Sequence, residues 1–331
     1  MDWTPFPSIE LKCGDGEANA DLTIVCLGEA DVKALSSSDD KVLCALLEDQ
    51  GDKFKAKAGS CTDVGRVMEG DKLKKVVLVG LGSEEDIAKG AGGVGLKVGS
   101  AIAKVCQAEK QVKVCTVKIS SVPDFVFSDL ASSFYSDMYS DNRYRNGDKQ
   151  VFPAKDLESV TIAFNGDVSA ATKAIENGIG LAKGIYLCKD IVNAPHNVLN
   201  SVSLANTAVR VAKETGGVIE TKILDKDECE KRKMGSYLGV ARGSETPPKF
   251  IHMTYKPKTE VKRKIGIVGK GLLFDTGGYN IKVQMMELMK FDCGGAAAVI
   301  GAAMAIAALQ PEGVEVHFCV VSDAEVLNKC Y

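Results

Sequence analysis

Runs of apolar residues alternate with helical spacings of apolar residues along the first half of the chain. Two compact apolar runs predict strands at Leu22–Leu27 and Val76–Val79, and alternating β-branched residues predict a third at Val112–Ile119. Small and apolar residues at helical spacing predict a helix over Gly90–Gln107, and a further strand over Val160–Phe164 ends at an Asn-Gly-Asp turn. Strands and helices in alternation are typical of a parallel α/β sheet. We therefore expect an N-terminal α/β domain over residues 1–166.

Ser, Asp, Asn and Tyr predominate over Asp124–Pro153, and we expect irregular structure there. Ser169–Lys189 predicts a long helix that links the first domain to a second one, over residues 167–331. Strands and helices alternate again in the second domain. Strands are expected at Val218–Leu224, Lys249–Tyr255, Lys264–Val268 and Val314–Val321. Helices are expected at Ser203–Lys213, Asp225–Arg232 and Gly294–Leu309. The mostly apolar strand Lys264–Val268 is expected in the middle of its sheet.

The composition excludes several classes of protein. Hydrophobic residues make up 45% and charged residues 26% of the 331 residues, a balance that excludes a disordered chain and suggests about two domains. The net charge of −3 argues against a nucleic-acid binder. The 11 cysteines are scattered without a C-x-x-C pair, which favours reduced thiols and therefore the cytoplasm, with a plastid as the alternative.

The sequence gives no signal for export or for a membrane. Met1–Pro5 carries no basic stretch and no apolar core of a signal peptide. The apolar run Cys293–Leu309 is dominated by Ala and Gly, and it is shorter than the ~20 residues that a membrane-spanning helix needs. We expect this run to form a buried, closely packed helix, and we expect no membrane partner.

Charged residues that could carry chemistry follow the strand that ends near Lys270. Open α/β sheets place ligands at the carboxyl ends of their strands. Asp275 follows in a glycine-flanked turn, and Lys282 and Asp292 come next. Carboxylates suit divalent metal ions, a lysine binds a metal only as the neutral amine, and a second, charged lysine can polarise a carbonyl. The alternative is two ordinary ion pairs, Lys270 with Asp275 and Lys282 with Asp292.

Other short motifs give weaker signals. A P-loop is excluded because Gly271 follows Lys270 where Ser or Thr is needed. The segment Gly80-Leu81-Gly82 follows a strand but lacks the third glycine of a dinucleotide site. The three histidines are too dispersed to suggest a zinc motif and are expected to be structural: His196, His252 and His317.

The sequence around the charged residues resembles the leucyl aminopeptidases, which are cytosol aminopeptidases with two metal ions, and the plant-type branch in particular. The resemblance rests on Val268–Gly271, Phe274–Gly278, Asn280–Lys282, Glu287–Asp292 and Gly294–Val299. Earlier segments also fit this family: Val77–Gly82, Lys189–Pro195, Met234–Gly235 and Gly239–Ser244. The match is dense from Asp190 to Phe318.

This resemblance implies a fold and a reaction. The family has an N-terminal macro-like α/β domain, a linking helix and a C-terminal α/β di-metal aminopeptidase domain, and it forms homo-hexamers. Two Zn or Mn ions activate a water that hydrolyses the first bond of peptides with a free N-terminus. By the resemblance, the metal ligands are Lys270, Asp275 and Asp292. Lys282 matches the catalytic lysine, and Met289 matches a wall of the substrate pocket, where Lys270 and Asp275 also bind substrate.

Two stretches depart from the family pattern. The second family signature, Asn-Thr-Asp-Ala-Glu-Gly-Arg, is not intact, and Asp323-Ala324-Glu325 is interpreted as a chance echo of its middle. Cys319–Tyr331 is interpreted as an unrelated tail, so that the catalytic domain is expected to be incomplete. Only Val283–Met286 stands where the family has a longer stretch containing Gly and Pro. These departures leave an alternative open, a non-catalytic family member that acts as an assembly partner.

Overall fold

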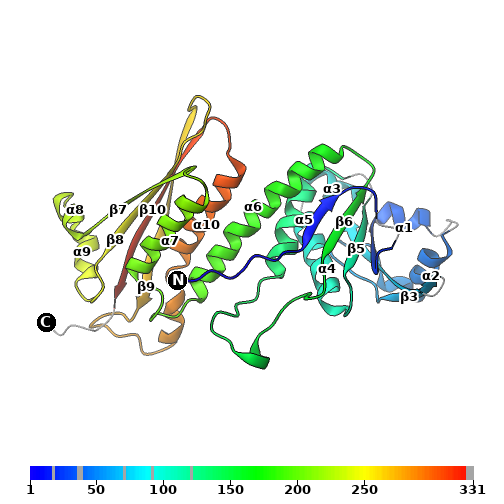
Figure 1. Cartoon of the computed structure of the whole chain (residues 1–331), viewed down its shortest axis with the longest axis horizontal. Helices are drawn as coiled ribbons and strands as arrows, with labels where there is room; N and C mark the ends of the chain where they lie inside the picture. The colour runs from blue at the N-terminus through cyan, green and yellow to red at the C-terminus, as the bar shows by residue number, and fades with distance from the viewer. Residues whose placement is uncertain (17–18, 36–39, 70–71, 91–92, 120–121, 326–331) are drawn as a thin grey trace. The chain divides into compact units, whose positions relative to one another are not determined.

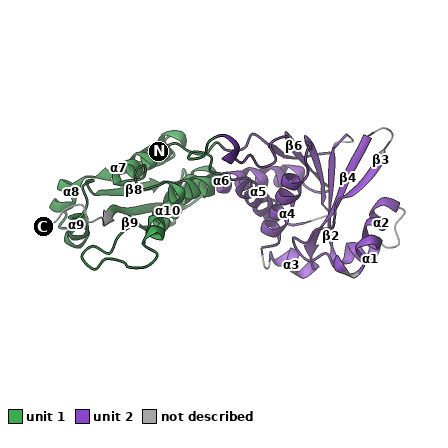
Figure 2. Ribbon diagram, turned by 90° about the horizontal axis from the view of Figure 1, so that it is seen from below, with its two compact units in different colours: residues 1–5, 141–146, 183–331 green, residues 6–140, 147–182 purple. Residues whose placement is uncertain are grey.

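A computed structural model of the chain describes residues 1–16, 19–35, 40–69, 72–90, 93–119 and 122–325 (Figure 1). The chain divides into two units (Figure 2): unit 1 holds Met1–Pro5, Asp141–Asn146 and Lys183–Tyr331, and unit 2 holds Phe6–Ser140 and Gly147–Ala182. The division falls inside helix α6 (Val168–Asn193), which is longer than the predicted linking helix. The domain boundary expected at residue 166 precedes this helix and stays a prediction.

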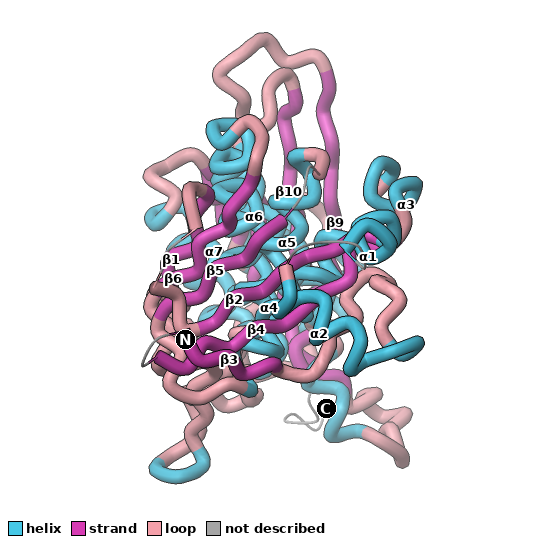
Figure 3. The backbone as a smooth tube through the Cα atoms, turned by 90° about the vertical axis from the view of Figure 1, so that its right-hand side faces the viewer, coloured by secondary structure: helices cyan, strands magenta, loops and turns pink. Residues whose placement is uncertain are grey.

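Unit 2 is built on a six-stranded sheet. Its strands are β1 (Glu10–Cys13), β2 (Leu22–Gly28), β3 (Gly65–Glu69), β4 (Lys72–Gly82), β5 (Val114–Ile119) and β6 (Ser159–Phe164). They lie in the order β1-β6-β5-β2-β4-β3, and all the pairs are parallel except that of β3 with β4 (Figure 3). The parallel sheet predicted from the apolar runs is therefore present.

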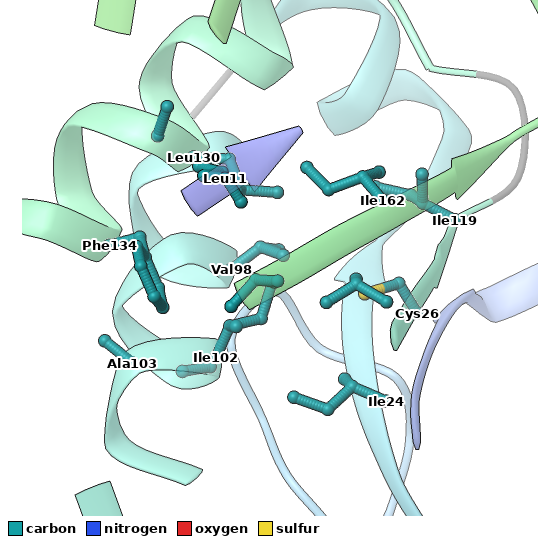
Figure 4. Packing of buried hydrophobic residues seen from close by; sticks show 14 of the residues in the cluster. Leu11, Ile24, Cys26, Val98, Ile102, Ala103, Ile119, Leu130, Phe134 and Ile162 are labelled. Carbon is teal, nitrogen blue, oxygen red and sulfur yellow. The ribbon is translucent and has the colours of Figure 1, made fainter. Parts of the chain in front are cut away.

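Helices cover both faces of this sheet. The helices of unit 2 ahead of α6 are α1 (Glu29–Leu35), α2 (Lys41–Gln50), α3 (Glu84–Lys89), α4 (Val94–Ala108) and α5 (Asp124–Asp137), with short 3₁₀ turns at Gly51–Lys53 and Gly147–Lys149. The first part of α6 packs with α4 and α5 against the larger core, whereas α1 and α2 pack on a smaller cluster on the other face. Figure 4 shows side chains of β2 and β6 facing those of α4 and α5: Ile24, Cys26, Ile162, Val98, Ile102, Leu130 and Phe134.

Helix α5 contradicts the irregular structure that was expected from Asp124 onward. Its buried side chains recur on one face of a helix, and most of them are aromatic or small rather than aliphatic: Val126, Phe127, Leu130, Ala131, Ser132, Phe134 and Tyr135. Aromatic side chains bury as much surface as aliphatic ones, so they also define the buried face of a helix. The helical spacing is visible only when the aromatic residues are counted together with the aliphatic ones. Glycine on α4 lets the two helices approach closely, because a Cβ at Gly99 would lie 2.2 Å from the Leu130 carbonyl oxygen.

Unit 1 is built on a four-stranded sheet. Its strands are β7 (Ile219–Leu224), β8 (Lys249–Tyr255), β9 (Arg263–Asp275) and β10 (Val314–Glu325), in the order β7-β8-β10-β9. Its further helices are α7 (Ser201–Glu214), α8 (Lys226–Lys231), α9 (Gly235–Ala241) and α10 (Gly294–Leu309), with a 3₁₀ turn η3 (Met286–Phe291). The central position predicted for Lys264–Val268 is wrong in the described sheet. Strand β9 lies at one end, and β10 is the strand paired on both sides, because an apolar run does not specify which strands will flank it.

The Ala- and Gly-rich helix α10 lies in the core of unit 1. The stretch Met286–Leu309 is long and apolar enough to cross a membrane, a test that buried core helices also pass. Here α10 packs on β9 and β10, and Ala296, Ala297 and Ile300 are fully buried. A Cβ at Gly301 would lie 2.5 Å from the carbonyl oxygen of Gly184, so α10 and α6 meet through a pair of glycines. This agrees with the expected buried, closely packed helix.

A buried carboxylate ties three separate segments of unit 1 together. Asp190, on α6, is 1% exposed and accepts hydrogen bonds from the backbone nitrogen of Thr4 (2.7 Å) and from its hydroxyl (2.5 Å). Arg143 lies 3.3 Å from the Asp190 carboxylate and 2.7 Å from that of Asp141. Its guanidinium also donates to the backbone carbonyl of Asp2 (3.0 Å). The guanidinium therefore joins the N-terminal segment and residues 141–146 to α6.

Replacing Arg143 with Met is expected to lower the free energy of unfolding by about 3 kcal/mol at pH 7, because it leaves two largely buried carboxylates without their cation. The hydrogen bond from Arg143 lowers the pKa of Asp141. The contribution of Asp141 is therefore fully present above its unfolded pKa of about 3.9 and is lost as the pH falls through the lower folded value. Urea unfolding from pH 7 to pH 3 should show the two proteins converging below about pH 4.

The matched control is Arg232→Met, which removes an exposed pair with Glu228 (3.4 Å) and should cost less than about 1 kcal/mol. An Arg143→Met protein no less stable than this control would contradict the role given to Arg143.

Candidate metal and substrate site

The first part of the candidate site is the turn that follows β9. The backbone nitrogen of Gly277 donates to the Asp275 carboxylate (2.8 Å), and the backbone nitrogen of Lys282 donates to the carbonyl of Thr276 (2.9 Å). Gly277 has φ +84°, and a Cβ there would lie 2.3 Å from the Asn280 carbonyl oxygen, so the turn requires glycine at this position. The chain thus folds back and brings the Lys282 ammonium to 2.9 Å from the Asp275 carboxylate.

The second part forms where α10 begins beside β9. A Cβ on Gly295 would lie 2.7 Å from the backbone nitrogen of Lys270, and a Cβ on Gly269 would lie 2.3 Å from the carbonyl oxygen of Gly295. Two glycines therefore let the two backbones touch. Asp292 ends η3 just before α10, and its carboxylate lies 3.1 Å from the Lys270 ammonium.

These two contacts join the predicted residues into different pairs from those in the ion-pair alternative. Lys270 pairs with Asp292 and Lys282 with Asp275, so the pairing inferred from proximity in sequence was wrong. Met289 is half-buried in η3, and its carbonyl accepts a hydrogen bond from the backbone nitrogen of Asp292 (3.2 Å). The roles of all five residues as ligands, catalytic group or pocket wall stay predictions.

The remaining side chains around these residues limit the metal chemistry. Within the ranges that the structure describes, no group of three or more His, Cys, Asp or Glu side chains could hold a metal ion. Cys293 is next to Asp292 but fully buried, and burial raises the pKa of its thiol to about 11. It is therefore a neutral thiol at pH 7 in the absence of a metal ion. A metal here would depend on the two aspartates and a deprotonated Lys270.

A small cavity of about 180 Å³ lies beside Lys270 and is also lined by Tyr237, Asp323 and Val321. Asp323, on β10, is only 2% exposed. The Tyr237 hydroxyl donates to the carbonyl of Ser322 (2.9 Å), and burial together with the nearby Asp323 raises the pKa of Tyr237. The sequence did not indicate that Asp323 lies beside Lys270, because Asp323 was considered there only as part of the second family signature. The pairing of β10 with β9 explains its position.

The structure also joins two of the three histidines that seemed dispersed. His252 and His317 lie on the paired strands β8 and β10, with 3.0 Å between Nε2 of the first and Nδ1 of the second. The other ring nitrogen of His317 lies 2.8 Å from the Glu315 carboxylate, which pairs with Lys264 (3.0 Å). Burial, then His317 and Lys222, lower the pKa of His252. Spacing along the chain could not reveal a contact between strands 65 residues apart.

The fold and these residues define an α/β protein in which unit 1 places paired lysines and aspartates on and after the parallel strand β9. Two family models match the chain: the N-terminal domain of the cytosol aminopeptidase family over residues 27–148 and its catalytic domain over residues 186–327. The chain belongs to the cytosol aminopeptidase family.

Known relatives agree with this assignment. A probable cytosol aminopeptidase of Picosynechococcus is 41% identical over 80% of this chain and 52% of its own length. Leucine aminopeptidase 2, chloroplastic, of rice is 39% identical over 83% of this chain and 46% of its own length. The solved structure of a tomato leucine aminopeptidase mutant superposes with a TM-score of 0.78 and 29% identity, over 98% of this chain and 64% of that one. The chain thus spans about half to two thirds of the length of these relatives.

The family match corrects the interpretation of Cys319–Tyr331 as an unrelated tail. The catalytic-domain model extends to residue 327, and β10 continues through residues 319–325 in pairing with β9. Residues 319–325 therefore belong to the family domain, although no intact family motif is present in their sequence. Residues 328–331 lie beyond the match and outside the described residues.

Replacing Gly295 with Ala is expected to destabilise unit 1 by about 1–3 kcal/mol, because the new Cβ would overlap the backbone of Lys270. Urea unfolding measures the change. The neighbouring Gly294→Ala is the matched control, since a Cβ at Gly294 meets nothing within 4 Å and should change stability by less than about 0.5 kcal/mol. Equal stabilities of the two variants would contradict the close backbone contact.

Proposed function

We propose that this chain takes part in metal-dependent removal of N-terminal residues from peptides, through a site formed by Lys270, Asp275, Lys282 and Asp292. The observation that carries the proposal is the pairing of these lysines and aspartates at the end of β9, within the region matched by the catalytic-domain family. The names of the relatives, leucine and cytosol aminopeptidases, support a leucine-like residue at the substrate N-terminus.

The residues fit a divalent metal ion through the chemistry of their donor atoms. Asp275 and Asp292 supply carboxylate oxygens, and both are mostly shielded from solvent, with side chains 13% and 22% exposed. Lys270 supplies a nitrogen when its ammonium loses a proton. In the absence of a metal, the two ammonium groups balance the two carboxylates. We assign Lys270, Asp275 and Asp292 as the groups that hold the metal ions, zinc or manganese.

Bound metal ions would supply an activated water and a Lewis acid for the free α-amine. The chain's own contribution is orientation. Gly277 donates to one carboxylate oxygen of Asp275 and fixes its rotamer, while Lys282 lies 2.9 Å from the other oxygen. A substrate carbonyl placed beside Lys282 would accept a hydrogen bond from its ammonium, which stabilises negative charge that develops on that oxygen. Met289, half-buried in η3, is assigned to the pocket for the N-terminal side chain.

The family resemblance also supports an assembly and a compartment. We propose a homo-hexamer acting on small peptides with a free N-terminus. The names of the relatives include both cytosol and chloroplastic enzymes, which supports the cytoplasm with a plastid as the alternative.

Metal binding by the purified chain tests the assigned ligands. Titration calorimetry with Mn²⁺ should show binding that Asp275→Asn weakens at least about tenfold, because the amide keeps the shape but loses the charge. The matched control is Asp225→Asn, since Asp225 also pairs with a lysine, Lys249, but lies apart from any second aspartate–lysine pair. Equal Mn²⁺ affinities of the two variants would refute the assigned ligands.

Hydrolysis of leucyl-p-nitroanilide separates catalysis from binding. Turnover should require Mn²⁺ or Zn²⁺, and Lys282→Met should lower kcat by about 10²-fold or more while metal binding persists. One observation favours the alternative of a non-catalytic family member: the described residues include no group of three or more His, Cys, Asp or Glu side chains that could hold a metal ion. Metal binding without any turnover would support that alternative.

A further inference from the structure

A cavity of about 770 Å³ lies in unit 2, apart from the residues discussed so far. The strands β2, β5 and β6 form its floor, and helix α1 forms one wall. On the opposite wall, the chain that follows β1 lies directly on the sheet, because a Cβ at Gly16 would be 2.8 Å from the Thr116 side chain. The volume falls in the range of roughly 300–1,000 Å³ that small-molecule sites occupy.

The position of the cavity follows from the order of the strands. From β2 the chain continues into α1, which packs on the face of the smaller cluster, and it returns to the sheet on one side of β2. After β4 it crosses to the other side of β2 to form β5, and α5 after β5 packs on the opposite face (Figure 3). The carboxyl ends of β2 and β5 are thus neighbours, but the helices that follow them, α1 and α5, lie on opposite faces of the sheet. Open α/β sheets bind ligands in the crevice at such a switch point.

The floor of the cavity combines an apolar surface with a few polar groups. Val25 and Leu27 of β2 line the floor but are only 8% and 7% exposed, so the more accessible apolar side chains of the lining are Ala34, Leu35 and Ala163. Thr23 and Thr116 contribute hydroxyls, and Asn165 contributes an amide at the end of β6. Sites for small organic ligands have this composition, an apolar body with a few convergent polar groups.

Lysines give the cavity its charge preference. Lys118, near the carboxyl end of β5, lines the cavity, and its side chain is exposed. It forms no ion pair with any residue in the described part of the chain. Lys74 of β4 also lines the cavity. Among the described residues that line the cavity, Asp31 is the one carboxylate, and it accepts a hydrogen bond from the backbone nitrogen of Gly28 (2.8 Å). Lysine binds phosphate as a point charge, so the exposed ammonium of Lys118 favours a phosphate-bearing ligand.

We propose that this cavity binds a phosphate-bearing metabolite of nucleotide size, with its phosphate at Lys118 and its apolar part against Ala34 and Leu35 of α1. The site lies wholly within unit 2 and uses none of the residues assigned to the metal. Its occupancy is therefore independent of the proposed peptidase function.

Binding of AMP to the full chain in the presence of EDTA tests this proposal. EDTA removes any metal ion at the other site, so that AMP cannot bind there through a metal. Equilibrium dialysis should detect AMP binding, with adenosine and inorganic phosphate each at least about tenfold weaker, because each lacks one half of the ligand. Lys118→Gln should weaken AMP binding about tenfold or more without altering the thermal unfolding midpoint. The matched control is Lys113→Gln, at the opposite end of the same strand, where Lys113 pairs with Glu158 (2.9 Å); it should bind AMP like the parent chain.

Three results would overturn the proposal: no AMP binding at millimolar concentration, adenosine binding as tightly as AMP, or equal AMP affinities of the Lys118 and Lys113 variants. None of these results bears on Mn²⁺ binding by Asp275, so failure of one proposal leaves the other intact.

Discussion

Helix α10 begins where β9 passes beside it, and the two backbones touch there without side chains between them. Gly269 and Gly295 make this contact possible, and the candidate metal site depends on it. Lys270 follows Gly269 directly on β9, and Asp292 precedes Gly295 by less than one helical turn. A side chain at either glycine would separate the strand from the helix and, with them, the ammonium from the carboxylate that lies 3.1 Å away. A second glycine contact, Gly184 with Gly301, holds the same helix against α6.

The two lysine–aspartate pairs are weak enough to be replaced by a metal ion. Lys270 and Lys282 have side chains 59% and 34% exposed, and pairs with that exposure contribute only about 0–1 kcal/mol each. Asp275 and Asp292 are much less exposed, so a nearby positive charge, from an ammonium group or from a metal ion, would stabilise each carboxylate. The ammonium groups thus hold the carboxylates in place, and in the proposed metal site their displacement would cost little. The Asp190 network differs, because the side chains of Arg143 and Asp190 are only 8% and 1% exposed, so their ion pair is shielded from solvent.

The sequence allowed most elements to be predicted, and the exceptions have physical causes. Apolar runs located the strands and the buried helix α10, since burial on both faces leaves continuous apolar stretches. The helix α5 was missed because most of its buried side chains are aromatic or small rather than aliphatic. The position of β9 in the sheet and the contact of His252 with His317 depend on strand pairing, which no local pattern specifies. Likewise, the motifs identified Lys270, Asp275, Lys282 and Asp292, but only the fold showed which lysine meets which aspartate.

The same topological rule explains why one candidate site was visible in the sequence and the other was not. Both sites use lysines near the carboxyl ends of parallel strands, Lys270 on β9 and Lys118 on β5. In unit 1 the polar groups come from one short stretch of chain, so their spacing forms a motif. In unit 2 the groups come from strands far apart in the sequence, from Thr23 to Asn165, and they meet only because the chain reverses its direction of strand addition at β2. A site assembled by strand order leaves no local pattern, and it becomes recognisable only from the cavity that the strand order creates.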